Sequence, residues 1–152
     1  MAARKPAAPL FTIGYEATTP DGLVAALQAA GVAVVADVRA LANSRKPGFA
    51  KTALSQRLAQ AGIEYWHLPA LGTPAAGRAA ARAGRPAEMR RIFGAHMQGT
   101  EAQAALASVT ARARGQKICL LCLEADPAGC HRTLVAEAMD ADGGFAVTHL
   151  HP

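Results

Sequence analysis

The feature that most constrains the fold is a regular alternation between short apolar runs and longer segments rich in Ala and Leu. Runs of this length with many β-branched and aromatic residues predict strands, and the segments between them have the composition of helices. The predicted strands cover residues 10–15, 32–38, 63–68, 117–123 and 145–150. Because strand and helix alternate, we expect an α/β fold: a single-domain three-layer sandwich with a mostly parallel sheet of about five strands flanked by helices.

Helix signals separate these strands. Thr19, Pro20 and Asp21 form a helix start, with a capping hydroxyl, a proline at the first position and an acid in the first turn, and Gly31 suits the helix end. Further helices are predicted at residues 52–61, 87–97, 100–114 and 130–139, whereas 69–86 predicts a long loop or a broken helix. Residues 1–9 are basic and rich in Pro and Ala, and we expect a flexible N-terminus there, before one domain at 10–152.

Composition limits the function classes. A chain of 152 residues, 51% hydrophobic and 18% charged, can bury one sizeable core, which argues against global disorder and against two ordinary domains. The formal charge of +5 favours anionic partners, either a small anion or nucleic acid. Part of this charge is an arginine cluster that is either an anion-facing patch or a solvated helix face, made of Arg78, Arg82, Arg85, Arg90 and Arg91.

The chain has three cysteines, no recognisable secretory signal and no apolar run of transmembrane length. We therefore expect a cytoplasmic location, no membrane association and reduced thiols. In that setting metal binding or reactivity is a better explanation for the cysteines than a disulfide framework.

Polar side chains stand at the ends of four predicted strands. The carboxyl ends of parallel strands meet at one edge of a sheet, where ligands bind in open α/β folds. The side chains delivered there are Tyr15 and Glu16, Asp37 and Arg39, His67, and Cys122 and Glu124. The segments that follow two of these strands add Asn43, Ser44, Arg45, Cys130, His131 and Arg132. We therefore expect one site at this edge.

The alternation of side chains along a strand divides the cysteines. Cys122 and Glu124 share one face, whereas Cys119 points to the other face. The apparent C-x-x-C pattern is therefore neither a chelating nor a redox pair, and Cys119 is expected to be an ordinary core thiol.

Cys130 falls in or near the first turn of a helix. Free N–H groups and the helix dipole favour a thiolate there, and Arg132 and a protonated His131 would add to the effect, so we expect the pKa of Cys130 to be lowered. Arg132 could also bind a phosphate or carboxylate at this helix start. The alternative is that Cys130 packs as a small apolar residue while Arg132 pairs with Glu124 or Asp37.

Several of these motifs together resemble one known family. They are Thr12-Ile-Gly-Tyr15, Asp37-Val-Arg39, Ser44-Arg45, Leu71-Gly72, and Cys122-x-Glu124 leading to Cys130-His131-Arg132. In order and spacing the chain resembles DUF488 from about Thr12 to Leu150. DUF488 is a domain of unknown function, so the resemblance implies a fold and the place of a site, and no reaction.

Each remaining candidate has a functional and a structural interpretation. Asp37 is a general base or a metal ligand, or else a buried acid paired with Arg39 or Arg45. The two arginines could instead clamp an anion. Ser44 contacts a ligand or caps its own loop, and His67 is a proton shuttle or a packed histidine bonded to a carbonyl.

Three functions remain open. The favoured one is an enzyme acting on a small anionic, phosphate- or nucleotide-like substrate, with no metal ligands assigned. Its catalytic candidates are Cys130, Cys122, Asp37 and Glu124, and its substrate-binding candidates are Arg39, Ser44, Arg45, Tyr15, His67, His131 and Arg132. The second is a non-catalytic nucleic-acid or nucleotide-binding module. The third is a zinc or iron site built from Cys122, Glu124, Cys130 and His131. The sequence identifies no cofactor and no oligomeric state.

Overall fold

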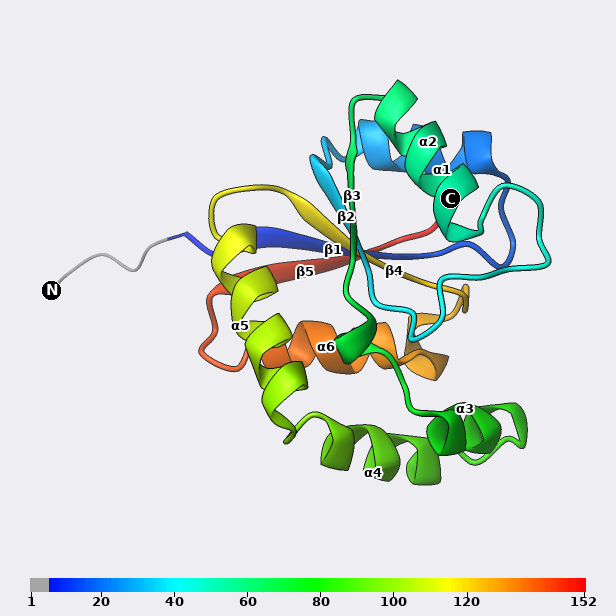
Figure 1. Ribbon diagram of the computed structural model, residues 1–152. Helices are drawn as coiled ribbons and strands as arrows, with labels where there is room; N and C mark the ends of the chain where they lie inside the picture. The colour runs from blue at the N-terminus through cyan, green and yellow to red at the C-terminus, as the bar shows by residue number, and fades with distance from the viewer. Residues whose placement is uncertain (1–5) are drawn as a thin grey trace, which may run out of the picture.

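The sheet has five strands and is parallel throughout, in the order β3-β2-β4-β1-β5 (Figure 1). The computed structural model describes residues 6–152. The strands are β1 (Ala8–Gly14), β2 (Val34–Asp37), β3 (Glu64–His67), β4 (Ile118–Cys122) and β5 (Phe145–Leu150). The helices are α1 (Pro20–Ala29), α2 (Lys51–Gln60), α3 (Ala75–Arg82), α4 (Pro86–His96), α5 (Thr100–Ala113) and α6 (His131–Met139). The predicted α/β fold is confirmed, and the sheet is wholly rather than mostly parallel.

Helices cover both faces of the sheet. Figure 1 shows α1 and α2 on one face and α5 and α6 on the other, with α3 and α4 further out on the α6 side. The core is divided in the same way, since Val35 and Cys119 pack with α1 and α2, whereas Val34 and Cys122 pack with α4, α5 and α6. Cys119 and Cys122 thus lie on opposite faces of β4, as strand alternation predicts.

The connections diverge at the centre of the sheet. β1 and β4 are neighbours, with Gly14 paired to Cys122, yet β1 leads to α1 on one face and β4 leads to α6 on the other. In open α/β sheets such a switch point leaves a crevice at the carboxyl ends of the two strands, because their loops leave in opposite directions. The ends of β1 and β4 are therefore where a ligand site is expected.

Local sequence explains the helix boundaries. The Thr19 hydroxyl accepts a hydrogen bond from the backbone N–H of Gly22 at 3.1 Å, Pro20 begins α1, and Gly31 takes the left-handed conformation (φ 71°) just after its end. Residues 69–86 adopt the broken-helix alternative: a 3₁₀ turn, Pro69–Leu71, and then α3.

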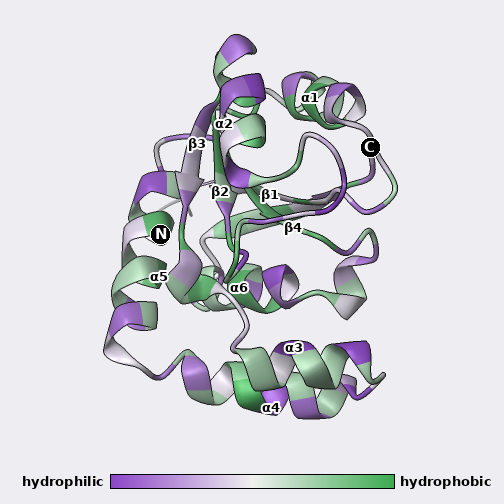
Figure 2. Ribbon diagram, turned by 45° about the vertical axis from the view of Figure 1, so that its right-hand side comes forward, coloured by the Kyte–Doolittle hydropathy of each residue, from purple (hydrophilic) through white to green (hydrophobic). Residues whose placement is uncertain are grey.

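The helices α3 and α4 form a hairpin, because Gly84 turns the chain with φ 73° and Pro86 begins α4. Figure 2 shows green and purple turns mixed along both helices, which lie beyond α6 from the sheet.

The N-terminus was expected to be flexible over residues 1–9. Residues 1–5 lie outside the described residues, and β1 already begins at Ala8. Within residues 6–152 no helix combines the length and apolarity needed to cross a membrane.

Candidate functional site

A cleft of about 630 Å³ opens at the switch point, above the carboxyl ends of β1 and β4. Its wall includes the loop after β2, the helix α3 and the segment after β4. The lining residues are Tyr15, Glu16, Arg39, Ala40, Leu41, Asn43, Thr73, Arg78, Ala81, Arg82, Met89, Cys122, Leu123, Glu124, Gly129 and His131. Five of the catalytic and substrate-binding candidates share this cleft, namely Tyr15, Arg39, Cys122, Glu124 and His131, together with Glu16 and Asn43, which were also expected at this edge.

One side of the cleft rests on an ion pair buried on the α1–α2 face. The Arg39 Nη2 and Nε donate to the Asp37 carboxylate at 2.7 and 2.9 Å, and Arg39 Nη1 donates to the Tyr15 hydroxyl at 3.1 Å and to the Phe49 carbonyl at 2.8 Å. The Tyr65 hydroxyl donates to the same carboxylate at 2.5 Å. Burial opposes the charge of Arg39, but Asp37 outweighs burial and the pKa of the guanidinium is raised.

Asp37 is consequently occupied by its neighbours. The side chain is fully buried, is not among the lining residues, and accepts from Arg39 and Tyr65. Burial, followed by the neighbouring Asp37, raises the pKa of Tyr65, so this phenol stays protonated. Of the two interpretations of Asp37, the geometry matches the buried acid paired with Arg39, and we assign it no proton transfer in the cleft.

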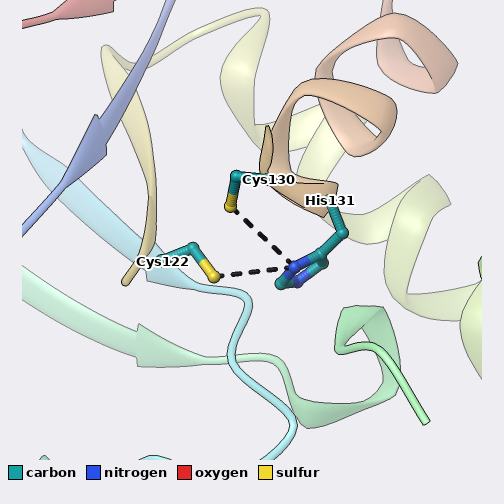
Figure 3. A group of neighbouring side chains, drawn as sticks. All are labelled: Cys122, Cys130 and His131. Carbon is teal, nitrogen blue, oxygen red and sulfur yellow. Dashed lines mark hydrogen bonds between the residues drawn. The ribbon is translucent and has the colours of Figure 1, made fainter. Parts of the chain in front are cut away.

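On the α6 face, the thiols of Cys122 and Cys130 converge on one imidazole nitrogen. Figure 3 shows Cys122 at the end of β4 and Cys130 with His131 at the start of α6, both sulfurs directed at the ring. The Nδ1 atom of His131 lies 3.5 Å from Cys122 Sγ and 4.0 Å from Cys130 Sγ. On the far side of the ring, Nε2 lies 2.6 Å from the Val38 carbonyl. A carbonyl can only accept, so Nε2 carries a proton and Nδ1 of the neutral ring offers its lone pair to the thiols.

Cys130 departs from the sequence-based expectation. It caps α6, with its sulfur accepting from the backbone N–H of Arg132 at 3.5 Å, so the predicted helix start is confirmed. Its side chain is only 3% exposed and is not among the residues lining the cleft. Burial, together with the nearby Cys122, raises the pKa of the Cys130 thiol well above its usual range. The expected lowering of this pKa is wrong, because desolvation and Cys122 together outweigh the opposing effect of His131.

Glu124 and Arg132 meet through the backbone. The Glu124 carboxylate lines the cleft, with Oε2 3.4 Å from Cys122 Sγ. Arg132 is fully buried, and its Nη1 donates to the Glu124 carbonyl rather than to either predicted carboxylate. Its Nε and Nη2 find no hydrogen-bond partner within residues 6–152. Arg132 therefore holds the segment after β4 and does not contact the cleft.

Three other predicted residues stay outside the cleft. The Ser44 hydroxyl accepts from the backbone N–H of Lys46 at 3.1 Å, which is its loop-capping alternative. The His67 ring bonds the Arg39 carbonyl through Nε2 at 2.9 Å, which is the packed alternative. Arg45 is exposed and does not line the cleft.

Two arginines on α3 line the cleft and were missing from the predicted site. Arg78 and Arg82 stand four residues apart, which places both on one face of α3. Arg78 Nη1 also donates to the Thr73 carbonyl at 2.8 Å. The sequence shows these side chains as part of a basic cluster, but nothing in residues 69–86 tells which strand end the cluster will face.

Comparisons with known proteins agree with this picture at the level of the family. Neither the curated proteins nor the solved structures contain a match to the chain. A family model does match, over residues 19–139, and its description is "Domain of unknown function DUF488". The matched segment includes α1, β4 and the Cys122–Glu124 and Cys130–Arg132 motifs, and so most of the fold and most of the cleft. The chain therefore belongs to the DUF488 family.

Proposed function

We propose that this protein is an enzyme that acts on a small anionic, phosphate- or nucleotide-like substrate in the cleft at the switch point. The observation that carries the proposal is the pairing of guanidinium groups with reactive groups in one cavity. Arg39, Arg78 and Arg82 line it together with Cys122 and His131. A cleft of about 630 Å³ has the size of a small-molecule site.

Positive charge favours an anion in this cleft. The lining holds three arginines against the carboxylates of Glu16 and Glu124, and Glu16 already accepts from the backbone N–H of Ala125 at 3.3 Å. Guanidinium groups bind phosphate through two parallel hydrogen bonds, which gives both affinity and orientation. Within residues 6–152, Arg78 and Arg82 form no ion pair with a carboxylate, whereas Arg39 is bound by Asp37.

The lining also has an apolar part. Leu41 and Leu123 are large hydrophobic side chains that stay 57% and 42% exposed, and both lie at the cleft. Exposed apolar side chains gathered at one cavity mark a surface that a ligand covers. They suit the organic part of a phosphate ester or a nucleotide better than inorganic phosphate.

The residues that would take part in the reaction in this cleft are Cys122, His131 and Glu124. Glu124 is the carboxylate placed to take up or release a proton. Cys122 and His131 offer electron pairs, on Sγ and Nδ1, within 3.5 Å of one another. Cys122, and not Cys130, is the thiol that reaches the cleft.

The test measures binding and turnover separately. Reduced protein is titrated by calorimetry with inorganic phosphate, sugar phosphates, nucleoside monophosphates and the matching nucleosides. We expect the organic phosphates to bind and the nucleosides to fail. The double variant Arg78→Ala/Arg82→Ala should lose about a hundredfold or more in affinity, because each charge-assisted bond contributes about 1.5–3 kcal/mol.

The control is Arg90→Ala/Arg91→Ala, which removes two exposed arginines that do not line the cleft. It should leave the affinity unchanged. For hydrolysis of a phosphate ester, water attacks phosphorus as the ester P–O bond breaks, and Glu124 takes the proton of the water and passes it to the departing alcohol. Glu124→Gln should therefore bind the same ligands and lose the release of phosphate and nucleoside. Equal losses in the two double variants, with tighter binding to oligonucleotides than to any small phosphate, would contradict the proposal and support a nucleic-acid-binding module instead.

A further inference from the structure

We propose that Cys122, Cys130 and His131 form a zinc site whose fourth coordination position opens into the cleft. The inference deepens the proposed function and rests on it for the role of the cleft. The sequence left a zinc or iron site as the less favoured alternative, and the geometry now points to zinc, to three of the four residues named there and to an open position. The three ligand atoms, two sulfurs and Nδ1, all lie within 4.8 Å of one another.

The distances suit a tetrahedral ion. With Zn–S of about 2.3 Å and Zn–N of about 2.0 Å, tetrahedral angles put S and N about 3.5 Å apart and two sulfurs about 3.8 Å apart. The Nδ1 atom of His131 lies 3.5 and 4.0 Å from the sulfurs of Cys122 and Cys130. The two sulfurs lie within 4.8 Å of each other, so rotamer adjustments that bring them up to about 1 Å closer would seat the ion. Two thiolates with one imidazole is also a donor set that zinc prefers.

The surroundings hold these ligands in a metal-binding arrangement. His131 uses Nε2 on the Val38 carbonyl at 2.6 Å, and this second contact is typical of a zinc-bound histidine because it fixes the tautomer and the ring orientation. The Phe93 ring packs edge-on against the imidazole at 5.4 Å. The backbone N–H of Arg132 points at Cys130 Sγ, which favours the thiolate that a metal requires.

The open position follows from which ligands reach the cleft. Cys122 and His131 line it, whereas Cys130 closes the site from behind with 3% exposure. Glu124 is the carboxylate beside the site, with Oε2 3.4 Å from Cys122 Sγ. An ion with three protein ligands and one open position is the arrangement of catalytic rather than structural zinc, and it can polarise an oxygen of a substrate held by Arg78 and Arg82.

Cobalt(II) substitution tests the site directly. Untagged protein is reduced, stripped with chelator and titrated with Co²⁺, and bound zinc is measured on a parallel sample. We expect one metal per chain, intense visible bands of tetrahedral cobalt and a thiolate charge-transfer band in the near ultraviolet. Cys122→Ser, Cys130→Ser and His131→Gln should each lose these bands and bound zinc. The matched control, Cys119→Ala, should keep both, because Cys119 lies on the opposite face of β4.

A variant that fails to fold would also lose the metal, so the ligands are identified independently by X-ray absorption spectroscopy on the zinc-loaded wild type. Two sulfurs and one imidazole nitrogen with one further light atom are expected. No metal bound by reduced wild type, a different sulfur count, or bands that persist in all three variants would overturn the zinc site. The two proposals fail separately: anion binding through Arg78 and Arg82 without metal would leave the enzyme proposal standing. Metal binding without anion binding would support the zinc site and contradict the proposed enzyme function.

Discussion

Two arginines, Arg39 and Arg132, are buried at the carboxyl edge of the same sheet, on opposite faces, and their surroundings differ. Arg39 is 5% exposed and bonds a carboxylate, a hydroxyl and a carbonyl. Arg132 is fully buried and bonds one backbone carbonyl, while its Nε and Nη2 lack hydrogen-bond partners among residues 6–152. The face that is electrostatically complete supports the wall of the cleft, and the incomplete face holds the thiol–imidazole cluster.

The charge of Arg39 is neutralised by its partners, whereas the charge of Arg132 acts on neighbouring titratable groups. A buried ion whose partners are all in place has its field cancelled nearby. Arg132 has no such partner, and its charge lowers the pKa of His149, after the larger effect of burial. Its field also extends to Cys119, although burial dominates there and raises the pKa of that thiol.

The largest loss of stability is expected from a substitution of Arg39, whose hydrogen-bond partners are all in place. Arg39→Met keeps most of the side-chain volume but leaves the Asp37 carboxylate buried without its ion partner. Removing one member of a buried pair costs about 3–5 kcal/mol of unfolding free energy. Urea unfolding measures this loss. A loss below about 1 kcal/mol would mean that the Asp37–Arg39 pair does not support the fold.

The same substitution at Arg132 should change the unfolding free energy much less. Arg132→Met removes a buried charge that has no carboxylate partner, and the one bond lost is that to the Glu124 carbonyl. Exchanging such an ion for an apolar side chain is close to neutral, so the unfolding free energy should change by no more than about 1 kcal/mol. The two methionine variants are thus matched. Equal losses would show that Arg132 is as fully compensated as Arg39, and the comparison would fail.

The smallest expected effect is the pH dependence of stability that His149 contributes. Its Nδ1 lies 2.6 Å from the Thr12 hydroxyl, and burial, Arg132 and His151 lower its pKa below the ordinary value of 6.5, against a weaker opposite effect of Glu137. The unfolded chain therefore binds this proton more readily than the folded one. The stability that neutral His149 contributes is fully present above about pH 6.5 and is lost as pH falls through the lowered pKa.

Urea midpoints measured above and below pH 6.5 check this prediction. His149→Gln should reduce the loss of stability in acid, and His151→Gln should reduce it by much less, because His151 lowers the pKa of His149 less than burial and Arg132 do. Identical pH profiles for the wild type and His149→Gln would exclude the effect of Arg132 on His149.

Most of the architecture could be predicted from local signals. The apolar runs predicted every strand, Thr19 and Pro20 predicted the start of α1, and alternation along β4 separated Cys119 from Cys122. These features depend on neighbours in the sequence, and such signals are the ones that a sequence carries most directly.

The finer chemistry of the site depends on burial and on distant neighbours, so it could not be predicted. The helix start at Cys130 was correct, but the direction of its pKa shift was not, since its desolvation comes from α4, α6 and the sheet packing together. Nothing local in residues 145–150 indicated that His149 would bond Thr12, a contact that exists because β5 pairs with β1. Arg78 and Arg82 reach the cleft because of how the α3–α4 hairpin folds back, which no short motif encodes.

The position of that hairpin has a consequence for how such a protein can diversify. The side chains of α3 that line the cleft lie between β3 and α5 in the chain, whereas Cys122, Cys130 and His131 belong to β4 and α6. Under the proposed function, selectivity and reactivity would thus be encoded by separate stretches of sequence. Exchanging the cleft-facing side chains of α3, within residues 75–82, would redirect the proposed site to a new ligand, while Phe93 of α4 stays packed against His131 and the cysteine–histidine cluster keeps its geometry. The fold is in this respect modular, and α3 is the part to randomise first in a selection for altered specificity.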